Sequence, residues 1–227
     1  MERISSPFQR FYEAAQRRYP AILFRGDRSR REIALTFDDG PHLRDTPRLL
    51  DILEKHAVPA TFHLVGKSIE RHPDLVRQIY GCGHQLALHC YRHVPFPLER
   101  PALLRAGLER TRDLIAQSTG IPTGQIRDLR PPYGWFTRHT YSLLTEWGYR
   151  LVMWNCMPAH WMQPIERSIR QVTDALAPGA LIVLHDGHGH GARVAEIVDA
   201  LIPRARALGL GFVTVEEMQS QRRPLPG

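Results

Sequence analysis

Cysteine is scarce in this chain of 227 residues, which contains only Cys82, Cys90 and Cys156. An odd number of cysteines without a CxxC pair excludes a disulfide framework and fits a reducing compartment. Long apolar runs are missing too, so the sequence predicts no membrane-spanning helix, and residues 1–24 lack the apolar centre of a signal peptide. Together these absences lead us to expect a cytoplasmic protein.

Patterns typical of nucleic-acid binding are also lacking, since no RNP-like, zinc-finger or recognition-helix sequence appears, and we expect no nucleic-acid partner. A formal net charge of +7 favours an anionic partner, such as a charged glycan or a lipid surface, although many basic proteins have no such partner. Residues 1–30 form a basic N-terminal extension. It is either an amphipathic helix that contacts a membrane surface or, as we favour, a helix packed on its own domain.

Short apolar runs alternate with amphipathic patterns over residues 31–220, without an internal repeat or a low-complexity linker. The strand-like runs are 32–37, 60–65, 84–89, 150–155, 180–185 and 211–215. The helical patterns are 46–58, 68–83, 100–120, 137–149, 165–179 and 192–209. This alternation predicts one α/β domain on a parallel sheet, either open or closed into a barrel. In such folds the functional site lies at the carboxyl ends of the strands.

Carboxylates and imidazoles stand at those predicted strand ends. The first strand ends at Asp38 and Asp39, the third at His89 with His93 four residues later, and the strand at 180–185 ends at His185. Asp-Asp-Gly-Pro is also a common turn sequence, so a simple turn is the alternative interpretation of the acidic pair. One carboxylate with two imidazoles, however, is a full set of protein ligands for a metal site kept open for chemistry.

A hydrolytic site needs a base, an acid and a donor for an oxyanion as well as a metal. Asp38 is the candidate base and His185 the candidate acid. Arg130 is the candidate partner that holds Asp38, and the backbone N–H of Tyr133 is the candidate oxyanion donor. The alternative for His185 is a histidine whose hydrogen bonds are satisfied within the fold. The alternative for Arg130 is a surface arginine before a polyproline turn.

Six segments carry a resemblance to a known family, over about residues 32–218. They are "TFDDGP", "ATFHLVG", "HCYRH", "RPPYG", "LIVLHDG" and "GFVTVEEM". In this order and spacing the chain resembles the polysaccharide deacetylases of carbohydrate esterase family 4, the NodB homology domain. The resemblance implies a distorted (β/α) barrel of about seven parallel strands. It also implies one divalent metal, usually zinc with cobalt or nickel as alternatives, and hydrolysis of an N-acetyl group on an amino sugar or, in some relatives, of an O-acetyl ester.

The resemblance also implies a role for individual residues, by their position in these motifs. The reacting groups would be the base Asp38, the metal ligands Asp39, His89 and His93, the acid His185 and the orienting Arg130. The substrate would meet the backbone of Tyr133, the pocket-lining Leu184 or Val183, and the sugar-stacking Trp135 and Trp161, although core packing is the commoner use of tryptophan.

The chain departs from the family in two motifs. Cys90 stands where Ser or Thr is usual, and we expect it to face away from the metal ligands, because neighbours on a strand point to opposite faces. The fourth motif, D-x-x-D-W in the family, reads "MPAHW", with Met157 and His160 in place of both aspartates. We therefore expect His185 to lack the carboxylate that would raise its pKa and fix its tautomer.

Two histidines that follow the fifth motif, His188 and His190, have three interpretations. They are a second metal site, a replacement for the missing acid or, as we favour, part of a polar loop. For the chain as a whole we expect a metal-dependent deacetylase. The alternatives are a glycan-binding relative that has lost catalysis and, less in keeping with a single three-ligand site, a metal phosphoesterase.

Overall fold

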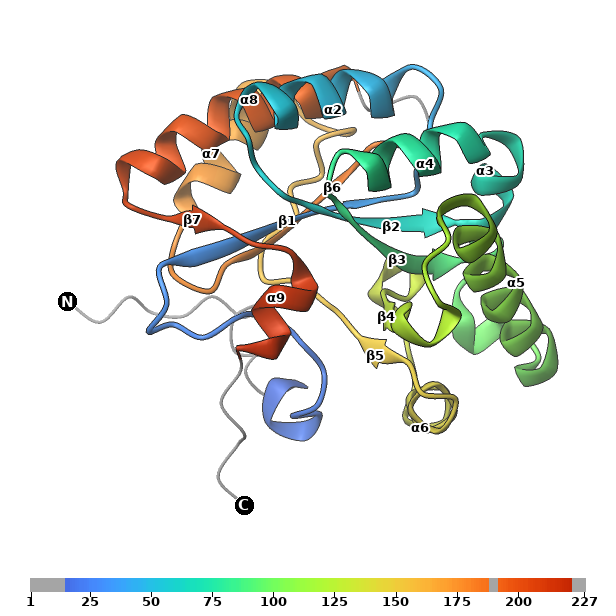
Figure 1. The fold of residues 1–227 in the computed structure, drawn as a ribbon. Helices are drawn as coiled ribbons and strands as arrows, with labels where there is room; N and C mark the ends of the chain where they lie inside the picture. Colours follow the sequence, from blue (N-terminus) through green and yellow to red (C-terminus); the bar gives the residue numbers. More distant parts are fainter. Residues whose placement is uncertain (1–14, 188–191, 222–227) are drawn as a thin grey trace.

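The computed structural model describes residues 15–187 and 192–221, which build one parallel sheet with helices packed around it (Figure 1). The strands are β1 (Glu32–Asp38), β2 (Thr61–Val65), β3 (Gln85–Cys90), β4 (Asp128–Leu129), β5 (Arg150–Leu151), β6 (Leu181–His185) and β7 (Gly211–Phe212). Their order is β5-β4-β3-β2-β1-β6, with β7 paired to the first residues of β1. Every pairing is parallel, so the carboxyl ends of the strands share one edge.

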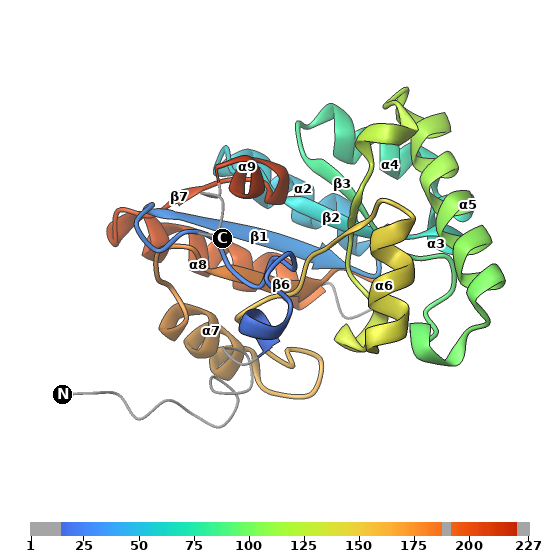
Figure 2. The ribbon, with the colours of Figure 1, turned by 90° about the horizontal axis from the view of Figure 1, so that it is seen from below.

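The helices cover the sheet, and all except α9, which follows the last strand, lie in the connections between successive strands. They are α2 (Asp45–Lys55), α3 (Gly66–Arg71), α4 (Pro73–Gly81), α5 (Pro101–Thr119), α6 (Arg138–Glu146), α7 (Ile165–Asp174), α8 (Ala192–Ala207) and α9 (Val215–Ser220). Three short 3₁₀ turns, η1 (Phe96–Leu98), η2 (Thr123–Gln125) and η3 (Pro132–Gly134), lie in the connections. Helices α2 and α8 lie side by side over one face of the sheet, whereas α5 and α6 lie beyond the β3–β5 side (Figures 1 and 2).

An irregular segment joins the two edges of the sheet and makes the predicted distorted barrel. The chain leaves β5 and crosses to β6, where the Val183 N–H donates to the Cys156 carbonyl at 2.9 Å. On its other side this segment pairs with the N-terminal region, since the Met153 N–H donates to the Leu23 carbonyl at 2.7 Å. The family fold expected from the sequence is therefore confirmed.

Several predicted element boundaries were wrong, each for a physical reason. The run 150–155 is a strand only at Arg150–Leu151, because the rest turns toward β6. Its apolar residues are buried in the core without belonging to a strand. The run 211–215 ends as a strand at Phe212, because Thr214 caps helix α9 in a capping box. The helix predicted over 68–83 is two helices that break at His72, before Pro73. Strand β4 was missed, since it has only two residues.

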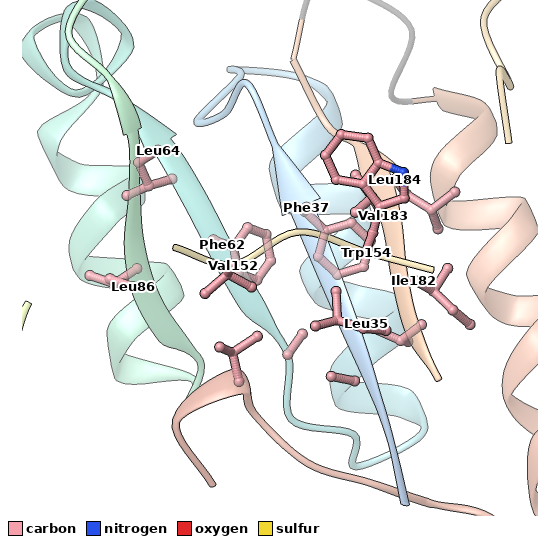
Figure 3. Close-up of a cluster of buried hydrophobic side chains, with 14 of the residues drawn as sticks. Leu35, Phe37, Phe62, Leu64, Leu86, Val152, Trp154, Ile182, Val183 and Leu184 are labelled. Atoms are coloured by element: carbon pink, nitrogen blue, oxygen red, sulfur yellow. The ribbon is translucent and has the colours of Figure 1, made fainter. Parts of the chain in front are cut away.

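The core lies between the sheet and its helices and supports the end of β1. Leu35, Phe37, Phe62 and Leu64 are fully buried, and the rings of Phe37 and Phe62 lie 5.1 Å apart (Figure 3). β2 is buried at every residue, as expected of a central parallel strand. Burying each such side chain stabilises the fold by roughly 1.5–3 kcal/mol, so the acidic pair at the end of β1 rests on a well-packed core.

The described part of the N-terminal extension packs on the domain. Ile22, Leu23 and Phe24 are buried in the same core, and the Tyr19 ring meets the edges of Phe136 and Tyr141 with centroids 5.4 and 5.0 Å away. The extension's first residues, 1–14, lie outside the described part of the chain. No helix among the described residues is long and apolar enough to cross a bilayer.

Acid should destabilise the fold through His84, a buried histidine immediately before β3. Burial lowers the pKa of His84 from 6.5 to about 4, and its ring packs 5.4 Å from that of Phe62. The unfolded chain therefore binds a proton more readily, so the contribution is complete above pH 6.5 and is lost as pH falls toward 4. The total loss would be about 3 kcal/mol.

Urea unfolding of wild type and His84→Gln between these pH values would measure this loss. We expect the stability of the variant to fall less steeply with acid, whereas His139→Gln, at an exposed site, should follow wild type. Equal slopes for wild type and His84→Gln would contradict the assignment.

Candidate active site

The turn after β1 separates the two aspartates. Asp38 is the last residue of the strand, and Asp39 adopts a left-handed backbone with a φ of 77°. A non-glycine residue pays for that conformation in free energy, and such residues gather at functional sites. Gly187 lies against the same turn, where an added Cβ would come within 2.6 Å of the Asp39 carbonyl oxygen. The turn interpretation of the sequence is thus right, and the turn sends the two carboxylates to different partners.

Asp39 converges with two histidines. Its Oδ1 atom lies 3.3 Å from Nε2 of His89 and 3.1 Å from Nε2 of His93, and the two nitrogens are 3.2 Å apart. His89 is on β3, and His93 reaches the same point because residues 91–93 bend away from the strand. These three residues are the group of possible metal ligands found in the described part of the chain.

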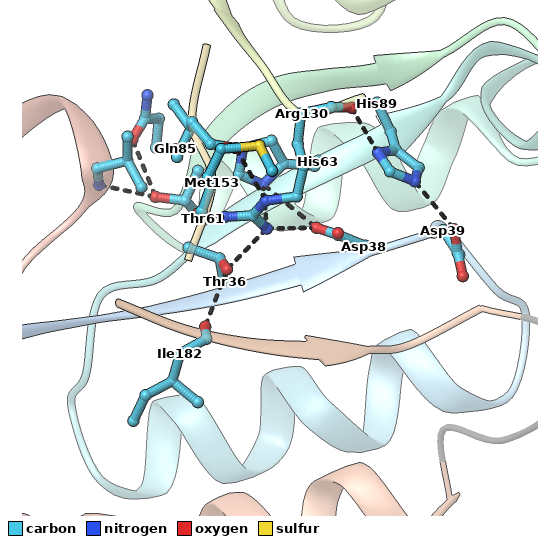
Figure 4. A network of polar contacts seen from close by, with 12 residues as sticks. Thr36, Asp38, Asp39, Thr61, His63, Gln85, His89, Arg130, Met153 and Ile182 are labelled. Carbon is cyan, nitrogen blue, oxygen red and sulfur yellow. Dashed lines mark hydrogen bonds and ion pairs between the residues drawn. The ribbon is translucent and has the colours of Figure 1, made fainter. Parts of the chain in front are cut away.

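The chemistry of these donors fits a divalent cation. Nδ1 of His89 lies 2.8 Å from the carbonyl oxygen of Arg130, which can only accept, so Nδ1 carries the hydrogen (Figure 4). A neutral His89 then presents a bare Nε2 to the Asp39 carboxylate and to His93. A cation between these atoms would pair with the lone pair of that nitrogen and with the carboxylate, and a carbonyl that accepts from the far nitrogen is typical of metal-binding histidines.

The electrostatics of the cluster follow from its charges. Burial acts to raise the pKa of Asp39, but the contacts with the imidazoles of His89 and His93 outweigh it and hold that pKa well below its usual range. Burial acts to lower the pKa of His89, but the carboxylates of Asp38 and Asp39 reverse this and raise it. The cluster therefore keeps a carboxylate ionised and favours a positive charge beside it.

Asp38 is held by the fully buried Arg130. Nη1 of Arg130 donates to Oδ1 of Asp38 at 2.6 Å and to the Thr36 hydroxyl at 2.8 Å. The other two guanidinium nitrogens donate to backbone carbonyls, Nε to Val152 at 3.1 Å and Nη2 to Met153 at 2.9 Å. With all three nitrogens bonded, the arginine is fixed, and it fixes the carboxylate in turn (Figure 4).

His63 is a residue of this network that the sequence analysis missed. It is fully buried on β2, with Nδ1 3.3 Å from Nη1 of Arg130 and 3.5 Å from Oδ1 of Asp38. Burial first, and then the charge of Arg130, lowers the pKa of His63 well below its usual value. It therefore stays neutral. The available signal was a histidine inside the apolar run "ATFHLV".

His185 ends β6 beside the two aspartates but lacks the carboxylate support that the family motif would give. Its Nδ1 is buried and has no hydrogen-bond partner among the described residues. The backbone N–H of His185 donates to Nε2 of His160 at 3.1 Å. The rings of His185 and Trp161 pack edge to face, with their centroids 4.7 Å apart. Burial lowers the pKa of His185, and the attraction of Asp38 and Asp39 offsets this only in part.

These groups open into one pocket of about 580 Å³. Its lining is Asp38, Asp39, His89, His93, Pro131, Tyr133, Gly134, Trp154, Met157, Trp161, His185 and Gly187. Tyr133 stands at the mouth with its ring 4.7 Å from that of His93. Trp154 is a lining residue that the sequence analysis missed, because it was assigned to a buried strand.

Some predicted site residues lie elsewhere. Leu184 and Val183 are fully buried in the core (Figure 3). Trp135 is exposed, and none of the three is among the pocket-lining residues. Cys90 is buried outside the ligand group, as expected, and burial raises the pKa of its thiol well above the usual value. His188 and His190 lie outside the described residues.

Comparison with known proteins places the chain among deacetylases. Residues 25–152 match the family model described as polysaccharide deacetylase. A peptidoglycan-N-acetylglucosamine deacetylase of Bacillus cereus is 32% identical over 87% of this chain and 72% of its own length. A chitooligosaccharide deacetylase of Bradyrhizobium sp. is 34% identical over 71% of this chain and 73% of its own length.

Solved structures agree on the fold. The peptidoglycan N-acetylglucosamine deacetylase Bc1960, in complex with 4-naphthalen-1-yl-N-oxidanyl-benzamide, has a TM-score of 0.82 and 31% identity, covering 87% of this chain and 92% of that chain. A mutant of BA3943, a CE4 family pseudoenzyme with restored enzymatic activity, has a TM-score of 0.81 and 25% identity, covering 90% and 73%. Because pseudoenzymes share this fold, catalysis has to be argued from the site itself.

Proposed function

Because this chain belongs to the polysaccharide deacetylase family, we propose that it removes the N-acetyl group of an amino sugar or glycan with one divalent cation held by Asp39, His89 and His93. The observation that carries this proposal is the pairing of two carboxylates at one turn. Asp39 meets two imidazoles while Asp38 is held by Arg130, and both open into the same pocket. Three protein ligands suit zinc, with cobalt or nickel as alternatives.

Asp38 is the base in this proposal. When bound, the cation would act as a Lewis acid toward a carbonyl oxygen and lower the pKa of water. Asp38 accepts the proton of the attacking water, and Arg130 keeps the carboxylate aimed at the pocket through the 2.6 Å contact. The neutral His63 packs behind this pair and fills the space without adding a charge.

His185 is the acid, and Tyr133 supplies a backbone N–H near the developing oxyanion. Protonated His185 gives its proton to the leaving nitrogen when the C–N bond breaks. Tyr133 has a positive φ of 59° and lines the mouth of the pocket, next to His93. Trp161 packs against His185 and lines the same wall, where a sugar face would stack on it.

An O-acetyl ester is the second candidate substrate, and the environment of His185 favours it. The pKa of His185 is lowered, and no carboxylate of the described residues accepts a hydrogen bond from its Nδ1. At neutral pH His185 is therefore protonated less readily than an ordinary histidine. An alkoxide leaves a tetrahedral intermediate more readily than an amide anion, because it is the weaker base. Breaking the C–O bond of an ester therefore depends less on a proton from His185 than breaking the C–N bond of an amide.

The test is an acetate-release screen with the zinc-loaded protein. The substrates would be chitooligosaccharides, acetylated xylan and an aryl acetate, with free amine measured beside acetate. We expect acetate and amine in equal amounts from the chitooligosaccharide. Acetate from the esters alone would support the second candidate. Bound zinc with no release from any of them would instead support a glycan-binding relative.

The alkaline limb of the pH–rate profile should show the effect of the aspartate that is absent from the fourth motif. Met157 takes the place of the first family aspartate and lines the pocket with His185. Met157→Asp would raise the pKa of His185, so the acid would stay protonated to higher pH and the alkaline limb would move up by about 1 unit.

The comparison variant is Met162→Asp, which adds the same charge at an exposed neighbour outside the pocket lining. It should leave the limb where it is in wild type. If Met157→Asp left the limb unmoved as well, His185 would not be the titrating acid.

A further inference from the structure

The exposed large apolar side chains are unevenly distributed between the two edges of the sheet. Of nine such residues in the described chain, seven lie in the loops and first helical turns that follow the carboxyl ends of strands. They are Leu43 after β1, Leu98 and Leu103 after β3, Tyr133 and Trp135 after β4, and Met157 and Met162 after β5. The other two, Tyr80 at the end of α4 and Leu208 after α8, lie where helices lead back to the opposite edge. Single exposed apolar residues are ordinary, but segregation to one edge is not.

The same connections carry positive charge. Arg44, Arg92 and Arg100 are exposed there, and Arg138 is exposed at the first residue of α6. None of the four forms an ion pair with another described residue. Outside the site itself, the carboxylates on this edge are the buried Asp45 and Asp186, the half-buried Glu99 and the exposed Glu166 in the first turn of α7. The edge around the pocket mouth is therefore both apolar and basic.

We propose that this edge docks on an anionic lipid bilayer, and that the pocket acts on acetylated sugars displayed at that surface. The docking edge is defined by Leu43, Leu98, Leu103 and Met162 with the four arginines. This inference rests on the proposed function only for the identity of the reaction. The membrane contact is a separate property that can be measured without catalysis.

The chemistry of the side chains selects a bilayer over a polymeric glycan. Glycans are recognised by flat aromatic faces and by polar groups. Tyr133 and Trp135 offer such faces on this edge, but the aliphatic Leu43, Leu98, Leu103 and Met162 do not. Aliphatic side chains next to arginines instead match the boundary between acyl chains and anionic headgroups, where each basic residue adds electrostatic attraction. Three leucines with more than half of their surface exposed, at 63%, 68% and 64%, are suited to insertion there.

The test is co-sedimentation of the full chain with vesicles of phosphatidylcholine, alone or mixed with phosphatidylglycerol. We expect binding to the mixed vesicles and weaker binding at high salt. Leu43→Ser/Leu98→Ser/Leu103→Ser should lower the affinity at least about tenfold, and Arg44→Gln/Arg138→Gln should remove most of the preference for phosphatidylglycerol. Tyr80→Ser/Leu208→Ser changes the same kind of residue at the opposite edge and should bind like wild type.

Several outcomes would overturn the proposal. They are no binding to either vesicle, an equal loss in the opposite-edge variant, or retention on insoluble chitin that depends on the three leucines while vesicles are ignored. Acetate release from a soluble chitooligosaccharide separates this proposal from the proposed function, since the triple leucine variant should keep it. Activity on the soluble substrate without vesicle binding would reject the docking edge alone.

Discussion

Asp38→Asn should bind zinc like the wild-type protein and lose about 10²–10⁴-fold in turnover. The amide keeps the shape of the side chain and can still contact Arg130, but it cannot accept a proton from water. Since Asp38 is not in the ligand group, the three metal-binding atoms stay in place. Isothermal titration with zinc, followed by acetate release on the same sample, measures both quantities.

Asp39→Asn should give the opposite result, with metal affinity falling by at least about tenfold and activity falling with it. An amide is a weaker ligand than a carboxylate, and it no longer supplies the negative charge that His89 and His93 face. Asp128→Asn is the matched control, because Asp128 is an equally buried carboxylate paired with Arg150 outside the pocket. It should change stability while leaving zinc affinity unchanged. If the Asp38 and Asp39 variants lost fold stability equally, with no change in zinc affinity or turnover, the acidic pair would have only a structural role in the turn.

Arg130→Met should damage both the stability of the fold and the activity. It removes the guanidinium from a site with no exposed surface and leaves Asp38 buried without its cation, which typically costs about 3–5 kcal/mol. Carbonyls of Val152 and Met153 would lose their donors at the same time. We expect a clear drop in the urea midpoint together with loss of activity. Arg130→Lys should recover part of the stability but less of the activity, because an ammonium cannot reproduce the fork of contacts.

Arg150→Gln serves as the comparison for Arg130. Arg150 also pairs with a buried carboxylate, Asp128, but its side chain is 40% exposed, and Asp128 also accepts hydrogen bonds from Gln85 and Gln219, both at 2.7 Å. Its loss should cost little stability and no activity. A wild-type pH–rate profile and turnover in Arg130→Met would show that Asp38 does not depend on the arginine.

The parts of the site that could be predicted from the sequence are those with local motifs. Asp38 with Asp39, and His89 with His93, are close in sequence and stand at strand ends, where a parallel sheet gathers them. The partnership of Arg130 with Asp38 spans 92 positions; the needs of a hydrolytic site made Arg130 a candidate, and the family resemblance implied the same role from its motif position.

The parts that were missed depend on packing. His63 and Trp154 sit in apolar runs, and which of their neighbours they touch follows from strand register and from the crossing of residues 152–156 to β6. Leu184 was placed in the pocket by its position next to His185. Adjacent strand residues face opposite ways, however, so Leu184 lies in the core while His185 faces the site. The prediction of about seven parallel strands was correct although several predicted strand ends were wrong, because the alternation of elements, rather than their exact lengths, sets the topology.

A metal titration of activity tests the central claim most directly. The protein would be stripped with a chelator, and zinc would be added back in small steps while acetate release from an N-acetylated chitooligosaccharide is followed. We predict no activity in the stripped protein and a linear rise that levels off at one ion per chain, as one Asp39–His89–His93 site requires. Full activity without metal, or a rise that continues to two ions per chain, would contradict the account.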